Sequence, residues 1–115
     1  MPEPAVLRAA APGDLLDWGP VAEPLGEPVS HTRGRLLAGG GGRFPEAGHW
    51  TCTPGTWRCV VTRDEFCHFL AGRAVYTHDD GAVRTLVAGD AAFFPAGWSG
   101  RCEVIETITK VYMIA

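Results

Sequence analysis

The stretch "GDAAFFPAGWSGR", residues 89–101, carries the clearest pattern in the sequence. It starts at Gly89, reaches Pro95 after an apolar run, and returns to glycine at Gly97. Glycine and proline at such positions mark turns, and the run between them has the length of a short strand. The pattern therefore predicts a strand enclosed by two tight turns.

The chain from about residue 30 onward is built in the same way. Short runs of β-forming residues are separated by Pro-Gly, Ala-Gly, Asp-Gly and Gly-Asp breaks. "HDDGAV" (residues 78–83) is the clearest hairpin, because Asp80-Gly81 suits a turn that needs positive φ. No sustained 3.6-residue apolar period interrupts this pattern. The sequence predicts an all-β sandwich or barrel over residues 30–115, with a flexible loop at residues 39–42.

The first 29 residues differ from the rest of the chain. They are rich in alanine and contain six of the nine prolines, namely Pro2, Pro4, Pro12, Pro20, Pro24 and Pro28. Because proline limits regular structure, we expect an N-terminal arm over residues 1–29 that packs along the domain surface. Within it, "PGDLLDW" (residues 12–18) suits one short helical turn.

Composition and charge exclude several classes of partner. A chain of 115 residues with 46% hydrophobic and 20% charged residues is typical of one globular domain. The net charge of -3 at pH 7, with scattered basic residues, argues against nucleic acid or an anionic membrane as partner. No apolar run approaches the roughly 20 residues of a membrane helix, and the start of the chain lacks the features of a secretory signal. We therefore expect a cytoplasmic protein.

The four cysteines fit a reducing compartment. They form no C-x-x-C pair, so the spacing does not indicate a zinc ribbon or a thioredoxin-like motif. The simplest interpretation is that they pack as small buried hydrophobic residues.

Two motifs give the sequence a family resemblance. "EFCHFLAGRAVYTHDDGAVRTLVAGDAAFFPAGWSGRCEV" (residues 65–104) resembles the conserved β-barrel of the cupin superfamily. The first cupin motif is matched by Glu65, Leu70 and Gly72, and the second by Gly89, Asp90, Pro95 and Gly97. The resemblance implies a six- to eight-stranded jelly roll with a site in the mouth of the barrel.

A smaller group within that superfamily is the closer likeness. "WTCTPGTWR" (residues 50–58), "EFCHFLAGR" (residues 65–73) and "KVY" (residues 110–112) are similar to the cupin_3 (DUF861) group. That group includes ureidoglycine aminohydrolase-like and EutQ-like cupins. The resemblance covers roughly residues 30–115, and the fold it implies hosts many unrelated chemistries.

The usual metal ligands of the superfamily are replaced in this chain. In ligand-bearing cupins, three histidines and one glutamate bind Mn, Fe, Ni or Zn. The resemblance places Cys59, Val61 and Gly100 at the histidine positions and Glu65 at the glutamate position. A single carboxylate does not hold a transition ion against water. We therefore predict that the usual metal site is missing and that no cofactor is bound.

A relocated metal site is the alternative. The two-residue period of a strand places Cys67 on the face of Glu65, and Cys102 on the face of Gly100. Zinc accepts thiolate and carboxylate ligands, so the candidate set is Cys59, Glu65, Cys67 and Cys102. The competing interpretation is that the barrel buries these thiols as apolar side chains.

Glu65 is the main candidate for catalysis, as an acid or base in the lumen. Lys110 is the second candidate: if it faces inward, it pairs with Glu65 or with a substrate carboxylate, and Tyr112 shares its face. If it faces outward, it is an ordinary exposed lysine. A structural ion pair of Glu65 with Arg58 or Lys110 is the competing interpretation.

Several other residues are candidates for ligand binding. Trp57 and Trp98 are predicted pocket walls, because Trp98 precedes Gly100 and a glycine there opens space beside the ring. Arg58 is a candidate anchor for an anion, and Cys67 and Tyr112 share the predicted faces of Glu65 and Lys110.

These candidates lead to two hypotheses about function. The first is a protein that binds, and in its enzymatic version transforms, a small polar metabolite in the barrel mouth without the usual cupin metal. The second is a non-catalytic module that binds a small ligand, with Glu65 structural. We also expect a homodimer, because a small β-rich domain tends to cover its sheet edges and apolar outer strands.

Overall fold

The computed structural model describes residues 2–6 and 14–115. Apart from Asp14, which has a 3-10 helical conformation, their regular elements are all β-strands, which confirms the predicted all-β jelly-roll barrel. The strands are β1 (Leu16–Pro20), β2 (His31–Gly40), β3 (Arg43–Cys52), β4 (Gly55–Val60), β5 (Glu65–His78), β6 (Val83–Val87), β7 (Ala91–Phe94) and β8 (Ser99–Ile114).

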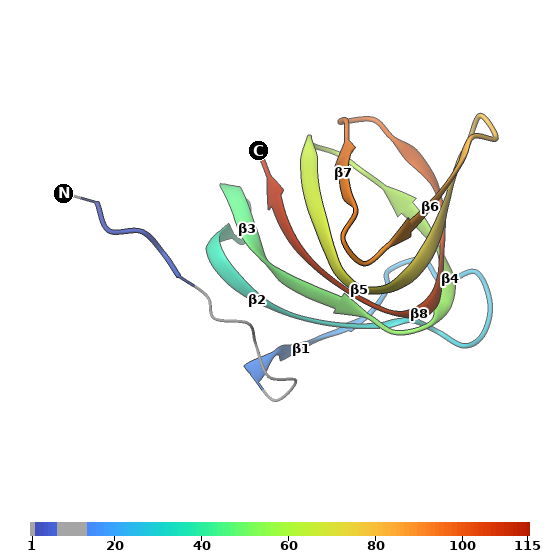
Figure 1. Ribbon diagram of the computed structural model, residues 1–115, viewed down its shortest axis with the longest axis horizontal. Helices are drawn as coiled ribbons and strands as arrows, with labels where there is room; N and C mark the ends of the chain where they lie inside the picture. Colours follow the sequence, from blue (N-terminus) through green and yellow to red (C-terminus); the bar gives the residue numbers. More distant parts are fainter. Residues whose placement is uncertain (1, 7–13) are drawn as a thin grey trace.

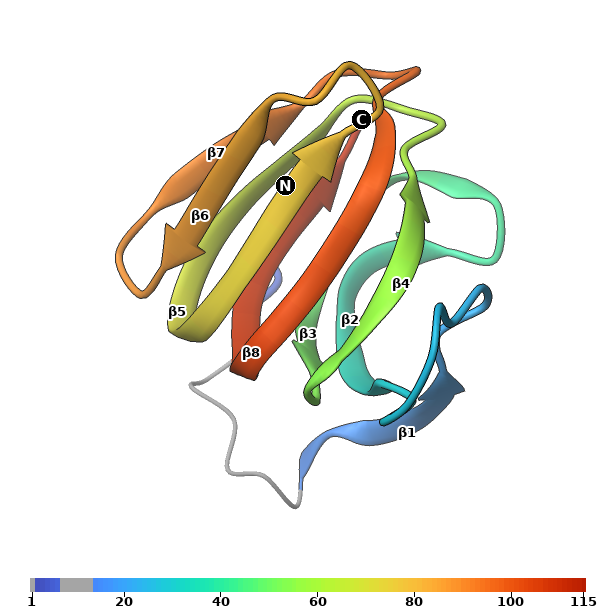
Figure 2. The ribbon, with the colours of Figure 1, turned by 90° about the vertical axis from the view of Figure 1, so that its right-hand side faces the viewer.

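Two long strands form the spine of the barrel. β8 has 16 residues and β5 has 14, and they pair antiparallel from Glu65↔Ile114 to His78↔Gly100. The sheet order is β1-β2-β3-β8-β5-β6, while β4 pairs with β8 and β7 pairs with β5. Each long strand thus pairs with other strands as well as with its partner, and the sheet curves round on itself into a barrel (Figures 1 and 2).

The turns around β7 are those that the sequence predicts. Gly89 and Gly97 have φ of 95° and 93°, a region that favours glycine. Their N–H groups donate to the carbonyl oxygens of Phe69 and Val61, each at 2.8 Å. Both turns are thereby attached to the barrel. The predicted hairpin at residues 78–83 is also present, with Gly81 at φ 97°.

The glycine run at residues 39–42 is more ordered than expected. Gly39 and Gly40 belong to β2, and only Gly41 and Gly42 form the turn to β3. Both turn residues have positive φ, as two-residue hairpins require. The expected flexible loop is therefore a tight hairpin.

The segment predicted to be an arm contributes a strand to the sheet. β1 pairs antiparallel with β2, so the helical turn expected over residues 12–18 is absent from Leu16 onward. Residues 7–13 lie outside the described part of the chain. The strand is favoured because Trp18 packs directly on Gly34, where any side chain would overlap its ring. Backbone groups on the edge of β2 supply the hydrogen bonds.

A bulge in β5 decides which of its residues face inward. Glu65, Cys67 and Phe69 share one face, but the register with β8 shifts between Phe69 and Ala74. Gly72 lies in this bulge with φ 87°, and a side chain there would overlap the carbonyl oxygen of Thr107. Before the bulge the odd-numbered residues of β5 face inward, and after it the even-numbered residues do. Tyr76 therefore faces the same interior as Cys67 and Phe69.

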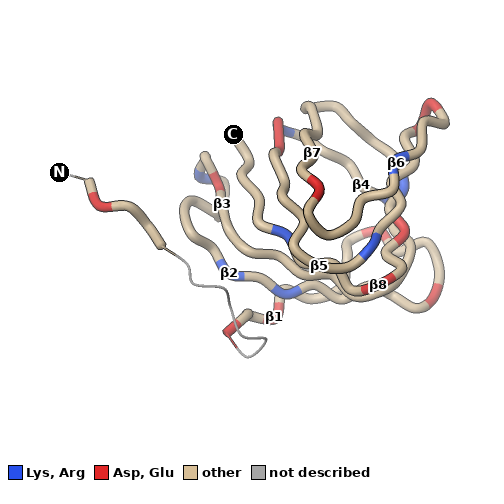
Figure 3. The backbone as a smooth tube through the Cα atoms, viewed as in Figure 1, with Lys and Arg blue, Asp and Glu red and all other residues tan. Residues whose placement is uncertain are grey.

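The core is small, and its largest fully buried side chain after Phe69 is Ile108. Cys52, Cys67 and Cys102 have no exposed surface, in agreement with their interpretation as packed apolar groups. Acidic and basic residues are interspersed along the chain (Figure 3). Within the described ranges, no helix has the length and apolar character needed to span a bilayer.

Ile108 and Ile105 provide a matched test of this core. Ile108 is completely buried, whereas Ile105, on the other face of β8, is 45% exposed. Ile108→Ala should lower the free energy of unfolding by about 3 kcal/mol, because it leaves a cavity. Ile105→Ala should cost less than about 1 kcal/mol. Urea denaturation measures both values, and equal losses would contradict the inward assignment of even-numbered β8 residues.

Candidate functional site

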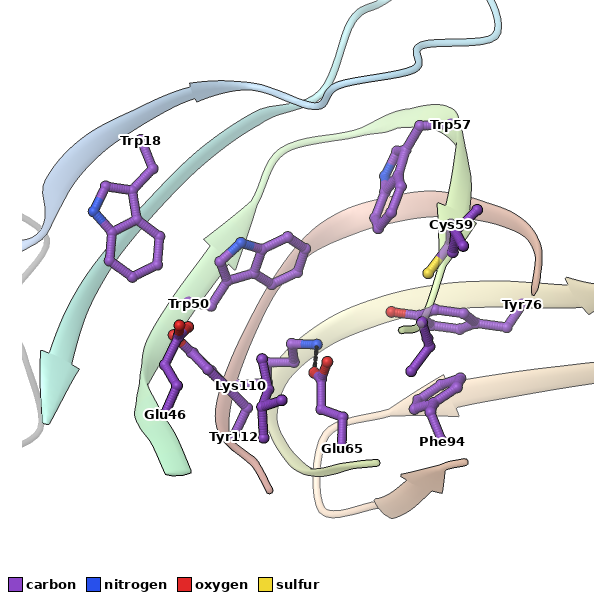
Figure 4. A pocket seen from close by; sticks show the side chains of 13 residues that line it. Trp18, Glu46, Trp50, Trp57, Cys59, Glu65, Tyr76, Phe94, Lys110 and Tyr112 are labelled. Atoms are coloured by element: carbon purple, nitrogen blue, oxygen red, sulfur yellow. Dashed lines mark hydrogen bonds and ion pairs between the residues drawn. The ribbon is translucent and has the colours of Figure 1, made fainter. Parts of the chain in front are cut away.

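A cavity of about 350 Å³ opens in the mouth of the barrel (Figure 4). Its aromatic walls are Trp18, Trp50, Trp57, Tyr76, Phe94 and Tyr112. Its charged lining residues within the described chain are Glu46, Glu65 and Lys110. An aromatic cavity with a few convergent polar groups is the usual form of a small-molecule site.

The register of three neighbouring strands brings the polar groups together. Lys110 on β8 lies between Trp50 on β3 and Phe69 on β5. Two residues further along β8, Tyr112 lies opposite Cys67. Side chains separated by an even number of strand residues share a face. Glu65 therefore shares the face of Cys67 on β5, Glu46 shares the face of Trp50 on β3, and both glutamates line the cavity.

Lys110 faces inward and forms an ion pair with Glu65. Its Nζ lies 2.9 Å from Glu65 Oε2, and the two side chains are 11% and 18% exposed. Lys110 Nζ is also 3.4 Å from Cys67 Sγ and 4.7 Å from the centre of the Trp50 ring. The structure thus answers the question that strand parity left open, and it selects Lys110 rather than Arg58 as the partner of Glu65.

The surroundings of Lys110 hold it in the charged form. Burial by itself lowers the pKa of this ammonium, but the nearby Glu65 carboxylate and Cys67 together more than offset that effect, so the pKa of Lys110 lies above its usual value. Tyr112 donates a hydrogen bond of 2.7 Å to Glu46 Oε2. Burial, followed by this hydrogen bond, raises the pKa of Tyr112 above its usual value.

Burial keeps the inward thiols protonated. It raises the pKa of Cys59 to about 11, and the pKa values of Cys67 and Cys102 to about 12. The positive charge of Lys110 acts in the opposite direction but is the smaller effect on all three. The thiol of Cys67 donates to Glu65 Oε2 at 3.1 Å.

The residues present do not fit the usual cupin metal. A side chain at position 100 would overlap the carbonyl oxygen of Thr77 and lie 2.8 Å from the Trp98 ring. The prediction that Gly100 opens space beside Trp98 is therefore wrong, because the Trp98 ring and the backbone of β5 already fill the volume next to Gly100. In the described part of the chain, no three His, Cys, Asp or Glu residues are grouped so that they could hold a metal ion. The candidate set for a relocated metal site, Cys59, Glu65, Cys67 and Cys102, therefore does not form such a group.

Trp98 and Arg58 lie outside the cavity that holds Glu65. Trp98 packs against Tyr76 and Phe94, at ring-centre distances of 6.1 and 5.2 Å, and lines a separate hollow on the far side of these rings. Arg58 faces away from the cavity and pairs with Asp79 through both of its terminal nitrogens. Trp57, by contrast, lines the cavity with Glu65, Lys110 and Tyr112.

Sequence reasoning missed several lining residues, among them Trp18, Glu46, Trp50 and Tyr76. The two-residue period leads from Trp50 back to Glu46, so both would have been found once β3 was placed beside β8. Trp18 was hidden by the expected helical turn, and Tyr76 by the bulge at Gly72.

Solved structures of similar fold support the barrel assignment. A DUF861 family protein from Thermotoga maritima has 27% identity and a TM-score of 0.58, covering 58% of this chain and 76% of that chain. A DUF861 family protein of unknown function from Pseudomonas syringae pv. tomato has 20% identity and a TM-score of 0.77. That match covers 88% of this chain but only 44% of the other, so this chain spans less than half of that protein's length.

A third similar structure is a putative ethanolamine utilization protein Q from Salmonella typhimurium. It has 21% identity and a TM-score of 0.63, with coverage of 73% of this chain and 68% of that one. A comparison with curated proteins gives no match. The EutQ-like cupin domain matches residues 40–112, which is more than half of the sequence, and the chain therefore belongs to the EutQ-like cupin (Cupin_3) family.

Proposed function

We propose that this protein binds a small polar metabolite in the mouth cavity, with Glu65 and Lys110 as its polar anchors and without a metal ion at the usual cupin position. The supporting observation is an ion pair in the wall of an aromatic cavity, 2.9 Å from Nζ to carboxylate oxygen. A buried ion pair is a poor source of stability, because desolvation offsets its attraction. Its place beside an open cavity favours a role in recognition.

Both partners of the ion pair retain capacity for a ligand. Within the described chain, the hydrogen bonds of Glu65 all end on Oε2, which leaves Oε1 to accept another. Lys110 has three N–H donors, and its contacts with Glu65 and Cys67 use two of them. A ligand with a donor and an acceptor close together would therefore be bound at this point.

The same contacts favour binding over covalent chemistry. Because the pKa of Lys110 is raised, its amine is protonated at neutral pH and does not act as a base or nucleophile. The raised pKa values of Cys59 and Cys67 likewise disfavour the nucleophilic thiolate. Proton transfer, if the bound metabolite is transformed, is left to Glu65. A non-catalytic binding module would use the same cavity.

A cytoplasmic location and a homodimer are further parts of the proposal. All four cysteines are free, which suits a reducing compartment. On the outer face of the barrel, Phe66 lies beside Phe93 and Met113, and all three side chains are exposed. A second copy of the chain would cover this apolar group.

Glu65→Gln tests the proposed anchor. The variant should bind no metabolite that raises the melting temperature of the wild type in a thermal-shift screen, because it loses the carboxylate. It should also lose about 3–5 kcal/mol of stability, since Lys110 is left buried without its partner. The ligand-induced shift is therefore measured against each variant's own melting temperature, alongside elemental analysis of bound metal.

Two companion variants separate binding from stability. The double change Glu65→Leu with Lys110→Met removes both charges, so it should recover stability while the ligand shift stays absent. Glu103→Gln removes an exposed carboxylate on β8 and should leave the ligand shift unchanged. If Glu65→Gln retains the full ligand shift, the site centred on Glu65 is wrong.

The thiols should react slowly in the folded protein. With a pKa of about 11, Cys59 should be alkylated by iodoacetamide about a hundredfold more slowly at pH 8 than an ordinary thiol of pKa near 9. The rate should rise with pH until about pH 11, because the thiolate fraction increases up to the pKa. Mass spectrometry at several pH values measures it, and the same thiols in denaturant are the control. Rapid labelling of native Cys59 or Cys67 at pH 7 would contradict this assignment.

The homodimer is tested by light scattering. The wild type should have twice the mass of the chain at micromolar concentration, and Phe66→Ser should shift it toward the monomer by removing an exposed apolar contact. A monomeric wild type would reject this part of the proposal.

A further inference from the structure

The mouth cavity has more negative than positive charge. Two carboxylates, Glu46 and Glu65, line it together with one ammonium, that of Lys110, among the described residues. The ammonium is already matched by Glu65 at 2.9 Å. Glu46 receives only the neutral hydroxyl of Tyr112 in the described structure. The charge that an incoming ligand meets is therefore negative.

The side chain of Glu65 is also slightly more exposed than that of Lys110. The side chain of Glu65 is 18% exposed and that of Lys110 is 11% exposed. Lys110 Nζ lies between the Trp50 and Phe69 rings, with ring centres at 4.7 and 5.9 Å, and points toward Glu65 (Figure 4). The ammonium of Lys110 is thus enclosed by two aromatic rings and a carboxylate.

The aromatic walls favour positive charge in the same way. Trp50 and Trp57 form an edge-to-face pair with ring centres 6.2 Å apart, and Trp18 lies toward the outer side of the cavity (Figure 4). Indole faces attract cations through the negative potential of the ring, and Trp50 already holds the ammonium of Lys110 in this manner. Trp18 and Trp57 have no such cation among the described residues.

From this combination we infer that the ligand of the mouth cavity is a small organic cation, such as a protonated amine, bound between the indole rings and the carboxylates of Glu46 and Glu65. The inference rests on the proposed function and narrows its ligand class. An anionic ligand is disfavoured because it would lie against two carboxylates and several ring faces, and the single ammonium is already paired.

Three small probes of similar size distinguish the possible charges. Benzylamine is a cation at pH 7, benzyl alcohol is neutral and benzoate is an anion, and each is small enough for a cavity of about 350 Å³. At low salt, calorimetric titration of the wild type should show benzylamine binding at least about tenfold more tightly than the other two. Quenching of tryptophan fluorescence, reduced in Trp57→Leu but still supplied by Trp18 and Trp50, reports binding at the mouth.

Glu46→Gln removes one charge with little change of shape. The amide oxygen can still accept the hydrogen bond from Tyr112, so the fold should be retained. Benzylamine affinity should fall by about three- to tenfold, while benzyl alcohol affinity stays the same. Glu103→Gln is the matched control on the outer face and should change neither value.

The outcomes separate this inference from the proposed function. Equal affinity for the three probes, or a preference for benzoate, would overturn the cationic ligand and leave a small-molecule site in place. An unchanged benzylamine affinity in Glu46→Gln would also overturn it. Absence of fluorescence quenching by all three probes at millimolar concentration would contradict both the inference and the proposed binding function.

Discussion

The antiparallel pairing of β5 with β8 is the constraint on which the rest of the structure depends. It runs from Glu65↔Ile114 to His78↔Gly100, and each of the two strands also pairs with other strands along parts of its length. This sharing curves the sheet into a barrel and places Lys110 beside the strand that carries Glu65. A register shift of one residue would turn every inward side chain of β8 outward. The fold and the cavity are therefore specified by the same hydrogen bonds.

The ion pair explains how the barrel retains a glutamate without the usual metal ligands. In the usual cupin site the metal ion compensates the carboxylate. Here the ammonium of Lys110, on the neighbouring strand β8, supplies the compensating charge at 2.9 Å. Each group holds the other in place, because the loss of one leaves a buried charge unpaired. The interior around Gly100 is filled differently, by Trp98 together with Tyr76 and Phe94.

Sequence patterns were most informative where backbone conformation depends on residue type. Gly81, Gly89 and Gly97 all have the positive φ that their turns require, and the strands between such turns lie where expected. The patterns were least informative where a residue's surroundings come from distant strands. The two-residue period that links Glu65 with Cys67 does not continue past Gly72, because a bulge against Thr107 changes which residues face inward. The space expected next to Gly100 is absent, because the Trp98 ring lies against this glycine.

By itself, the sequence determined the all-β class, the principal turns, the cupin resemblance and the absence of histidine at positions 59, 61 and 100. These features depend on local residue chemistry, such as φ preferences and the presence or absence of a donor atom. Only the tertiary structure decided that Lys110 faces inward, that Arg58 pairs with Asp79 outside the cavity, and that Trp18 joins its wall. Each of these depends on the register between strands that are distant in sequence. The final segment "ETITKVYMIA" (residues 106–115) is apolar or amphipathic on both faces. It therefore contains no signal that selects which face of β8 points inward.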